Sequence, residues 1–455
     1  MRRLAVRLVS HPISAVGLVL ALASGCVFAG LVVIHLFASP GNPYADIVVF
    51  VMLPPLFAVG LLLMAIGLRF ERRRPRTAAL GEPAWPTLDL NIPETRRALF
   101  FITAATLVSL VALSFASQRA VEYSESQEFC GQTCHQVMGP HYTAHQSGLH
   151  SRVGCVECHV EPGAEGFVRA KLHGTNQLRL ALTNRYPRPL LSPVHEGRPN
   201  VYTSCEQCHW PDRFIGDVVK VVYEFADDEA NSKTTSTLRL HVGGPVAGTG
   251  SGTGIHWHMN RSNVVEYVAI DEKLEEIPYV RVAMPNGEVR EYFSKGVSAG
   301  DMEGRPRRRM GCIDCHNRPA HTLASSPERA VDAAMGAGLI APQLPFIRRA
   351  AIGALRTEYP DQDTAVAGIN RGIRNALAAA KTDGLDEDAL RQAVAVSQAI
   401  YRTNIFPSMK ITWGTYPDRL GHTTSQGCFR CHDDSHVTKD GRALGQDCEM
   451  CHTIE

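Results

Sequence analysis

The sequence of 455 residues predicts a membrane-anchored protein with three transmembrane helices, followed by a mostly α-helical and irregular domain with a small antiparallel β insertion. Three observations lead to this fold class. Three long apolar runs occupy the first 120 residues, and a cysteine and histidine motif recurs six times in the region that follows. A stretch rich in β-branched residues separates two copies of this motif, as is typical of strands.

The apolar runs cover residues 13–37, 47–68 and 98–116 and carry almost no charge. A helix needs about 20 apolar residues to cross a hydrocarbon core of about 30 Å, so each run is a candidate span. A buried core helix or a cleaved signal peptide is the alternative, but three adjacent runs fit it less well. Residues 1–120 are therefore predicted to form a membrane anchor.

The arginines predict the orientation of this anchor. Arg2, Arg3 and Arg7 precede the first run and seven more arginines surround the loop before the third, whereas the loop after the first run has no Lys or Arg. Basic loops stay in the cytoplasm, so we expect a cytoplasmic N-terminus. Three crossings of a bacterial inner membrane then place the rest of the chain in the periplasm.

The region after the anchor repeats a pair of cysteines followed directly by a histidine. Twelve of the thirteen cysteines belong to the six copies, which are Cys130, Cys134 and His135; Cys155, Cys158 and His159; Cys205, Cys208 and His209; Cys312, Cys315 and His316; Cys428, Cys431 and His432; and Cys448, Cys451 and His452. A zinc site, a redox dithiol or a disulfide gives no reason for a histidine after every pair.

Covalent attachment of haem c explains the repeat. Two thiols a short turn apart each form a thioether with the porphyrin, and the next histidine then lies beneath the iron as its proximal ligand. We therefore expect six covalently attached haem c groups. The first copy, "CGQTCH", has three residues between its cysteines instead of two, so its loop must bulge slightly.

The sixth coordination positions have more candidates than irons, because eleven histidines lie outside the anchor and the motifs. Local spacing favours as distal ligands His150, His256 or His258, His321, His422 and His436. The others are His141, His145, His173, His195 and His241. An iron with two histidine ligands carries electrons, whereas an iron with an open position admits a substrate.

Two insertions separate the motifs. Runs such as "VVKVVYEF", with the turn "PNGE", predict an antiparallel sheet, and the glycine-rich "GTGSGTG" lacks the lysine of a phosphate loop. The second insertion is predicted to be helical, with Ser326 as N-cap and Pro327 in the first turn. The predicted segments after the anchor are 121–216 (motifs 1 to 3), 217–300 (β-rich), 301–325 (motif 4), 326–410 (helical) and 411–455 (motifs 5 and 6).

Several stretches together resemble one known family. They include "GNPYADIVVFVMLPPLF", "LDLNIPETRR", "FCGQTCHQVMGPHYTAHQSGLHSRVGCVECHVEPGAEGFVRAKLHG", "CEQCHWP", "GIHWH", "CIDCHNRP" and "GCFRCHDD". With these stretches the chain resembles the NapC/NirT/NrfH superfamily of multihaem quinol dehydrogenases, and in particular the larger ImcH-like inner-membrane cytochromes.

The resemblance implies a multihaem cytochrome, with six haems by its motifs, that oxidises quinol from the membrane quinone pool at the first haem. Electrons would pass to a periplasmic acceptor cytochrome or reductase in anaerobic respiration. It also implies that Met138 is an axial ligand of the first haem and that Lys171 contacts quinol oxygen, although Met138 could simply pack and Lys171 could face solvent or lipid. His35, an ionisable residue in the first span, is a further candidate for quinol contact, or for a hydrogen bond between helices.

Two other functions stay open on the sequence alone. A terminal multihaem reductase would need an iron with an open site, and the CxxCK motif of ammonia-forming nitrite reductases is absent. The chain could instead be a fixed electron-transfer subunit of a larger respiratory complex, with the insertions as docking surfaces. A net charge of +1 gives no reason to expect a nucleic acid as partner.

We predict that the intact mass of the mature chain exceeds that of the polypeptide by six haem groups, because all six copies meet the chemical requirement for attachment. Mass spectrometry of the purified protein measures this directly. Five haems, with peptide mapping that finds the first copy unmodified, would show that its longer spacing is not used.

Overall fold

The computed structural model describes residues 11–37, 53–73, 91, 93, 96, 97, 100, 115, 116, 118–133, 135–161, 163–190, 201–210, 216–245, 252–260, 262–382, 384–423 and 425–455. The chain divides into two compact units, residues 1–135 and 136–455.

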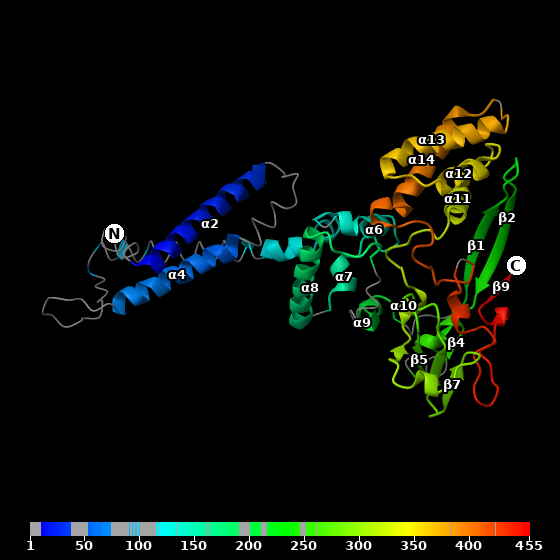
Figure 1. The fold of residues 1–455 in the computed structure, drawn as a ribbon, viewed down its shortest axis with the longest axis horizontal. Helices are drawn as coiled ribbons and strands as arrows, with labels where there is room; N and C mark the ends of the chain where they lie inside the picture. Colours follow the sequence, from blue (N-terminus) through cyan, green and yellow to red (C-terminus); the bar gives the residue numbers. More distant parts are fainter. Residues whose placement is uncertain are drawn as a thin grey trace. The chain divides into compact units, whose positions relative to one another are not determined.

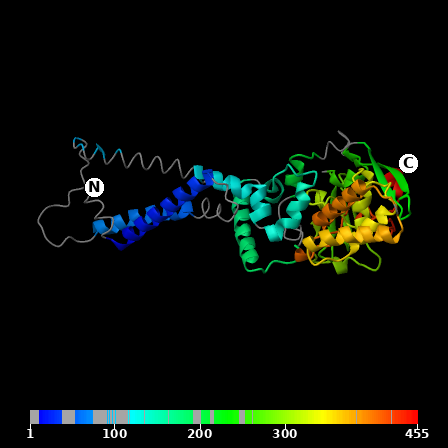
Figure 2. The same cartoon turned by 90° about the horizontal axis from the view of Figure 1, so that it is seen from above.

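The first unit contains two long helices, α2 (Pro12–Phe37) and α4 (Leu53–Arg73), which lie side by side (Figure 1, Figure 2). Small residues allow their backbones to approach closely. A Cβ atom added to Gly60 would lie only 2.6 Å from the backbone nitrogen of Ala21 and 2.9 Å from the carbonyl oxygen of Gly17. Close contact through small residues is typical of helix pairs in membranes.

The outward faces of this helix pair are apolar, since Val19 is 66% exposed and Leu62 is 60% exposed. Nevertheless, no helix among the described residues is both long enough and apolar enough to cross a membrane. The third predicted span, 98–116, lies outside the described residues except for three positions. The three crossings therefore stay a prediction.

The described part of the second unit begins with four helices, two of which contain cysteines of motifs 2 and 3. They are α6 (His135–Gln146), α7 (Cys155–His159), α8 (Ala164–Leu182) and α9 (Val201–Glu206). Gly163 precedes α8 with a positive φ of 95°, a conformation that favours glycine.

The expected antiparallel strands are present but divide between separate sheets. One sheet has the order β1-β2-β9, another β7-β6-β5-β8, and β3 and β4 form a short pair. Alternation of apolar residues predicts strands but not their partners, and β2 pairs with a strand from the C-terminal end of the chain. The strands are β1 (Val218–Phe225), β2 (Lys233–Leu240), β3 (Gly244–Pro245), β4 (Gly252–Thr253), β5 (Val264–Val268), β6 (Tyr279–Ala283), β7 (Val289–Phe293), β8 (Arg308–Arg309) and β9 (His452–Ile454).

Two of these strands bring motif residues into the sheets. Leu240 of β2 is paired with His452 of β9, so the histidine of motif 6 is part of a sheet ladder. Cys431 of motif 5 packs in the apolar core formed by Val265, Tyr267 and their neighbours. The sheets therefore hold the last two motifs in place.

The helical insertion has its own apolar core, which includes Ile347, Ile369 and Leu377. The hydroxyl oxygen of Ser326 accepts a hydrogen bond from the backbone N–H of Arg329 at 3.4 Å, which confirms the predicted N-cap. Apolar residues three and four apart build this core, as expected for amphipathic helices. The helices are α11 (Pro327–Gly336), α12 (Ile347–Arg356), α13 (Gln362–Ala379) and α14 (Glu387–Asn404).

Asn231, in the turn between β1 and β2, fastens the sheet to this insertion. Its amide donates to the carbonyl oxygens of Pro342 and Leu344, both at 2.9 Å, and its side-chain oxygen accepts from the backbone N–H of Arg348 at 3.0 Å. Asn231 is 1% exposed and has a φ of 48°, in the left-handed region. Asparagine tolerates this conformation and supplies the three hydrogen bonds.

We predict that Asn231→Gly lowers the free energy of unfolding by about 2 kcal/mol through lost buried hydrogen bonds. Asn231→Ala should cost about 1 kcal/mol more, because a Cβ atom without a compensating side chain is strained at positive φ. Urea unfolding followed by far-ultraviolet circular dichroism measures both. Equal losses in the two variants would contradict a role for the left-handed backbone.

Candidate haem-binding sites

The described motifs with two intervening residues each fold into about one helical turn. Motif 2 forms α7, and motif 4 forms α10 (Cys312–Cys315). Motifs 5 and 6 form the 3-10 turns η8 (Gly427–Arg430) and η9 (Cys448–Met450). Because residues i, i+3 and i+4 lie on one side of such a turn, the two sulfurs and the imidazole face the same way.

Backbone hydrogen bonds close these turns at the histidine. The N–H of His316 donates to the carbonyl oxygen of Cys312 at 2.7 Å, and the N–H of His432 donates to that of Cys428 at 3.0 Å. These hydrogen bonds hold the backbone of the histidine, which directly follows the second cysteine, in the turn. This is the arrangement that attachment through two thioethers and a proximal histidine requires.

Motif 1 lies partly in a π-helical turn, η2 (Phe129–Thr133), which is wider than an α-helical turn. An extra residue between the cysteines needs such widening. Cys134 and the side chain of His135 lie outside the described residues. Met138 follows His135 by three residues in α6 and is half-buried.

Five motif histidines each face a second histidine from elsewhere in the chain. The ring centroids are separated by 6.1 Å for His159 and His321, 6.0 Å for His209 and His150, 6.3 Å for His316 and His256, 5.9 Å for His432 and His258, and 6.2 Å for His452 and His422. Two imidazoles on opposite sides of one metal ion, each bonded at about 2 Å with its ring centre about 1 Å further away, are roughly 6 Å apart. The five separations therefore fit an iron between each pair.

Hydrogen bonds orient four of the facing histidines. The Nδ1 atom of His321 donates to the carbonyl of His141 at 2.9 Å, and that of His150 to the carbonyl of Pro319 at 3.0 Å. The Nδ1 atoms of His256 and His258 lie 3.2 and 2.9 Å from backbone carbonyl oxygens in the same way. A carbonyl acceptor at Nδ1 leaves the lone pair on Nε2, as in most histidines that bind a metal.

Burial favours the neutral form of three imidazoles, those of His321, His256 and His258. It lowers the pKa of His321 to about 4, and it also lowers the pKa values of His256 and His258. The pKa of His141, which lies 5.4 Å from His321 between ring centroids, falls to about 3 through burial and the nearby Arg318. A neutral imidazole keeps the lone pair that a metal ligand needs.

Neighbouring motifs lie close to one another in the order of the sequence, beginning with motifs 2, 3 and 4. Burial, Glu157 and the Cys208 thiol of motif 3 raise the pKa of Cys158. Cys205 donates a hydrogen bond to the sulfur of Cys312, which raises the pKa of Cys205 and lowers that of Cys312. In agreement, α9 contacts both α7 and α10 (Figure 1).

The order continues through motifs 5 and 6. Burial and the Cys428 thiol of motif 5 raise the pKa of Cys315 in motif 4 to about 11. Burial and the same Cys428 thiol raise the pKa of Cys451 in motif 6. Five motifs thus form one continuous series of neighbours.

The other predicted site residues have different surroundings. Lys171 is half-buried in α8, close to the exposed side chains of Val168 and Leu172. His35 belongs to α2, but its side chain lies outside the described residues. His436 is 2% exposed, and its two ring nitrogens lie 2.8 Å from an Asp433 carboxylate oxygen and 2.6 Å from the Ile277 carbonyl oxygen.

Two charged residues inside the motifs have roles that spacing alone did not indicate. Asp314, between Cys312 and Cys315, accepts hydrogen bonds from the Tyr267 hydroxyl and from the N–H of Gly311, both at 2.6 Å. Arg430, between the cysteines of motif 5, donates to the carbonyl oxygen of Asp314 at 2.7 Å. A charged residue within an otherwise buried turn is the signal that could have pointed to them.

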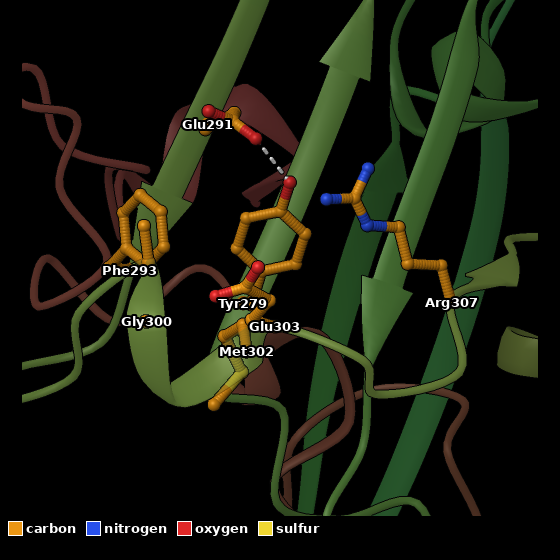
Figure 3. A pocket seen from close by; sticks show the side chains of 8 residues that line it. Tyr279, Glu291, Phe293, Gly300, Met302, Glu303 and Arg307 are labelled. Atoms are coloured by element: carbon orange, nitrogen blue, oxygen red, sulfur yellow. Dashed lines mark hydrogen bonds between the residues drawn. The ribbon is translucent and has the colours of Figure 1, made fainter.

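The β-rich segment also contains a cavity of about 280 Å³, which Figure 3 shows between Tyr279, Glu291, Met302 and Arg307. The Tyr279 hydroxyl donates to Glu291 at 2.5 Å. Burial and this hydrogen bond raise the pKa of Tyr279 to about 12. No cysteine or histidine of a motif lines the cavity, so it is separate from the candidate haem sites.

Comparisons with known proteins agree with the motifs. Residues 92–189 match the family model described as NapC/NirT cytochrome c family, N-terminal region. The chain is 37% identical over 452 residues to the cytochrome c-type protein ImcH of Geobacter sulfurreducens, an alignment that covers 98% of this chain and 88% of that protein. The comparison with solved structures gives no significant match.

Proposed function

Because this chain belongs to the NapC/NirT cytochrome c family, together with ImcH, we propose that it is a membrane-anchored hexahaem cytochrome that oxidises quinol. Electrons would pass along its haems to a periplasmic cytochrome or reductase in anaerobic respiration. When bound, haem c would supply one-electron carriers at the motifs.

The observation that carries this proposal is the set of five facing histidine pairs. We assign His321, His150, His256, His258 and His422 as distal ligands of haems 2, 3, 4, 5 and 6, in that order. Two histidines per iron leave no open position for a substrate at these five sites. The assignment therefore favours electron transfer over a terminal reductase.

The contacts between consecutive motifs support a single path for the electrons. The 3-10 turn η5 (Ile255–Met259) supplies His256 to haem 4 and His258 to haem 5, so one turn links two neighbouring sites. Motif 6, at the other end of the series from motif 2, has an exposed Cys448 and a 46% exposed Met450. We propose that electrons leave the protein at haem 6.

His436 is left out of the proposed ligand set. Both of its ring nitrogens face oxygen acceptors, Asp433 on one side and the carbonyl of Ile277 on the other. Because each ring nitrogen is engaged by one of these partners, neither nitrogen is left for iron. We propose that His436 stabilises the loop that contains Ile277 through its contact with the Ile277 carbonyl.

The first haem is the proposed entry point, since motif 1 follows the predicted anchor directly. Met138 lies three residues after His135 in α6 and is half-buried. As a ligand of haem 1, Met138 would require that His135 is displaced or lies opposite. A thioether ligand raises the potential of the haem, which favours acceptance of the first electron.

Quinol oxidation releases two electrons and two protons, and we propose that the protons leave to the periplasm. Lys171 is the residue proposed to contact a quinol oxygen. The exposed apolar side chains of Val168, Leu172 and Leu182 on α8 support a position of this helix near lipid. The small-residue packing of α2 against α4 supports a bacterial inner-membrane anchor. We propose a cytoplasmic N-terminus for it from the placement of the arginines.

We predict that His258→Ala frees one coordination position. Reduced protein should then bind one more carbon monoxide per chain than the unaltered protein, and a high-spin haem signal should appear. Optical titration with carbon monoxide counts the sites. His173→Gln, at an exposed position on α8, serves as control and should change nothing. Unaltered binding by His258→Ala would show that another residue occupies this position.

We predict that Lys171→Gln slows reduction of the haems by a quinol roughly tenfold, the effect of losing one charged hydrogen bond of about 1.5 kcal/mol. Stopped-flow reduction by a soluble quinol analogue measures this rate. Reduction by dithionite, which needs no quinol site, is the control and should keep its rate. Equal slowing with both donors would indicate a folding defect.

A further inference from the structure

A buried positive charge beside the proposed haem sites belongs to Arg430. Its side chain is 7% exposed and lies between the cysteines of motif 5. Its Nε atom donates to the Gly427 carbonyl at 2.8 Å, Nη1 to that of Leu274 at 2.9 Å, and Nη2 to that of Asp314 at 2.7 Å. The guanidinium group thus spans from motif 5 to motif 4, because Asp314 lies between Cys312 and Cys315.

All three acceptors are neutral carbonyl oxygens. Within the described part of the chain, no carboxylate forms an ion pair with Arg430. The Asp314 carboxylate is instead engaged by the Tyr267 hydroxyl and the N–H of Gly311. Arg419 offers a contrast, since it is equally buried, at 6% exposed, but is paired with Glu275 at 3.2 Å.

An unpaired buried cation is costly, because removing a charge from water is only partly offset by carbonyl dipoles. Its field also reaches further than that of a surface charge, since water does not screen it. A ferric haem carries one more positive charge than a ferrous haem. A fixed cation nearby therefore disfavours the ferric state and raises the reduction potential.

We infer that Arg430 is a positioning residue that joins haem sites 4 and 5 and raises the reduction potentials of both. Electrons that reach the middle of the series would be held at this pair before they pass to haem 6. The inference rests on the proposed function, because it requires haem at motifs 4 and 5.

The backbone around Arg430 supports a fixed position for this charge. Leu274, one of the three acceptors, has a φ of 53°, which is unusual for a residue with a branched side chain. The neighbouring carbonyl of Lys273 accepts a hydrogen bond from Arg419. Two buried arginines therefore hold this loop with its carbonyl oxygens turned inward, and the loop in turn fixes Arg430.

The test compares two substitutions at the same position. Arg430→Lys keeps the charge but loses the planar fork that reaches three carbonyls, whereas Arg430→Met removes the charge and keeps an extended side chain. Both variants should melt at a lower temperature than the unaltered protein. Only Arg430→Met should lower the potentials of two haems, shifting the equilibrium of each toward the ferric state by roughly tenfold, as a unit charge at about 10 Å does in a medium of dielectric about 20.

Spectroelectrochemical titration of all haems supplies the readout, after intact mass has established the haem count of each variant. Arg391→Met, at an exposed position on α14, makes the same change in net charge and should leave every potential unaltered. Unchanged potentials in Arg430→Met, or equal shifts in the lysine and methionine variants, would overturn the inference. Haems missing from motifs 4 and 5 in the unaltered protein would instead refute the proposed function.

Discussion

The second unit is built around one geometric constraint, which is that two imidazoles face each other across roughly 6 Å at five places. Each pair joins segments that are far apart in the sequence. His321, which follows motif 4, faces His159 of motif 2, and His150, which precedes motif 2, faces His209 of motif 3. The polypeptide between the motifs must therefore pass repeatedly from one motif to another. In this region the histidine pairs take the place of a continuous apolar core.

The β-rich and helical insertions serve this constraint in different ways. The sheets present the turn η5, whose two histidines face two different motifs. The helical insertion leaves the motif region and returns to the same place, because the side-chain oxygen of Asn404 accepts a hydrogen bond from the N–H of Ala324 at 2.6 Å. Its core is apolar and contains no histidine pair among the described residues.

The sequence predicted the chemistry of the motifs better than it predicted which histidines and which strands pair with one another. Cysteine spacing identifies each motif because the reaction is local, and a helix start such as Ser326 depends only on its neighbours. The pairing of His258 with His432, or of β2 with β9, depends on tertiary folding that no local pattern encodes. The role of Arg430 was missed for the same reason, since two of its three acceptors lie more than 100 residues away.

In the proposed ligand set, hydrogen bonds distinguish the ligands from the other histidines by the ring nitrogen that they engage. In His321 a carbonyl occupies Nδ1 and leaves Nε2 directed toward the partner ring. In His436 both nitrogens face acceptors, and in His145 the Nε2 atom itself lies 3.1 Å from the carbonyl of Val153. The choice of ligand thus depends on which nitrogen the backbone engages, and not only on which histidine lies near a motif.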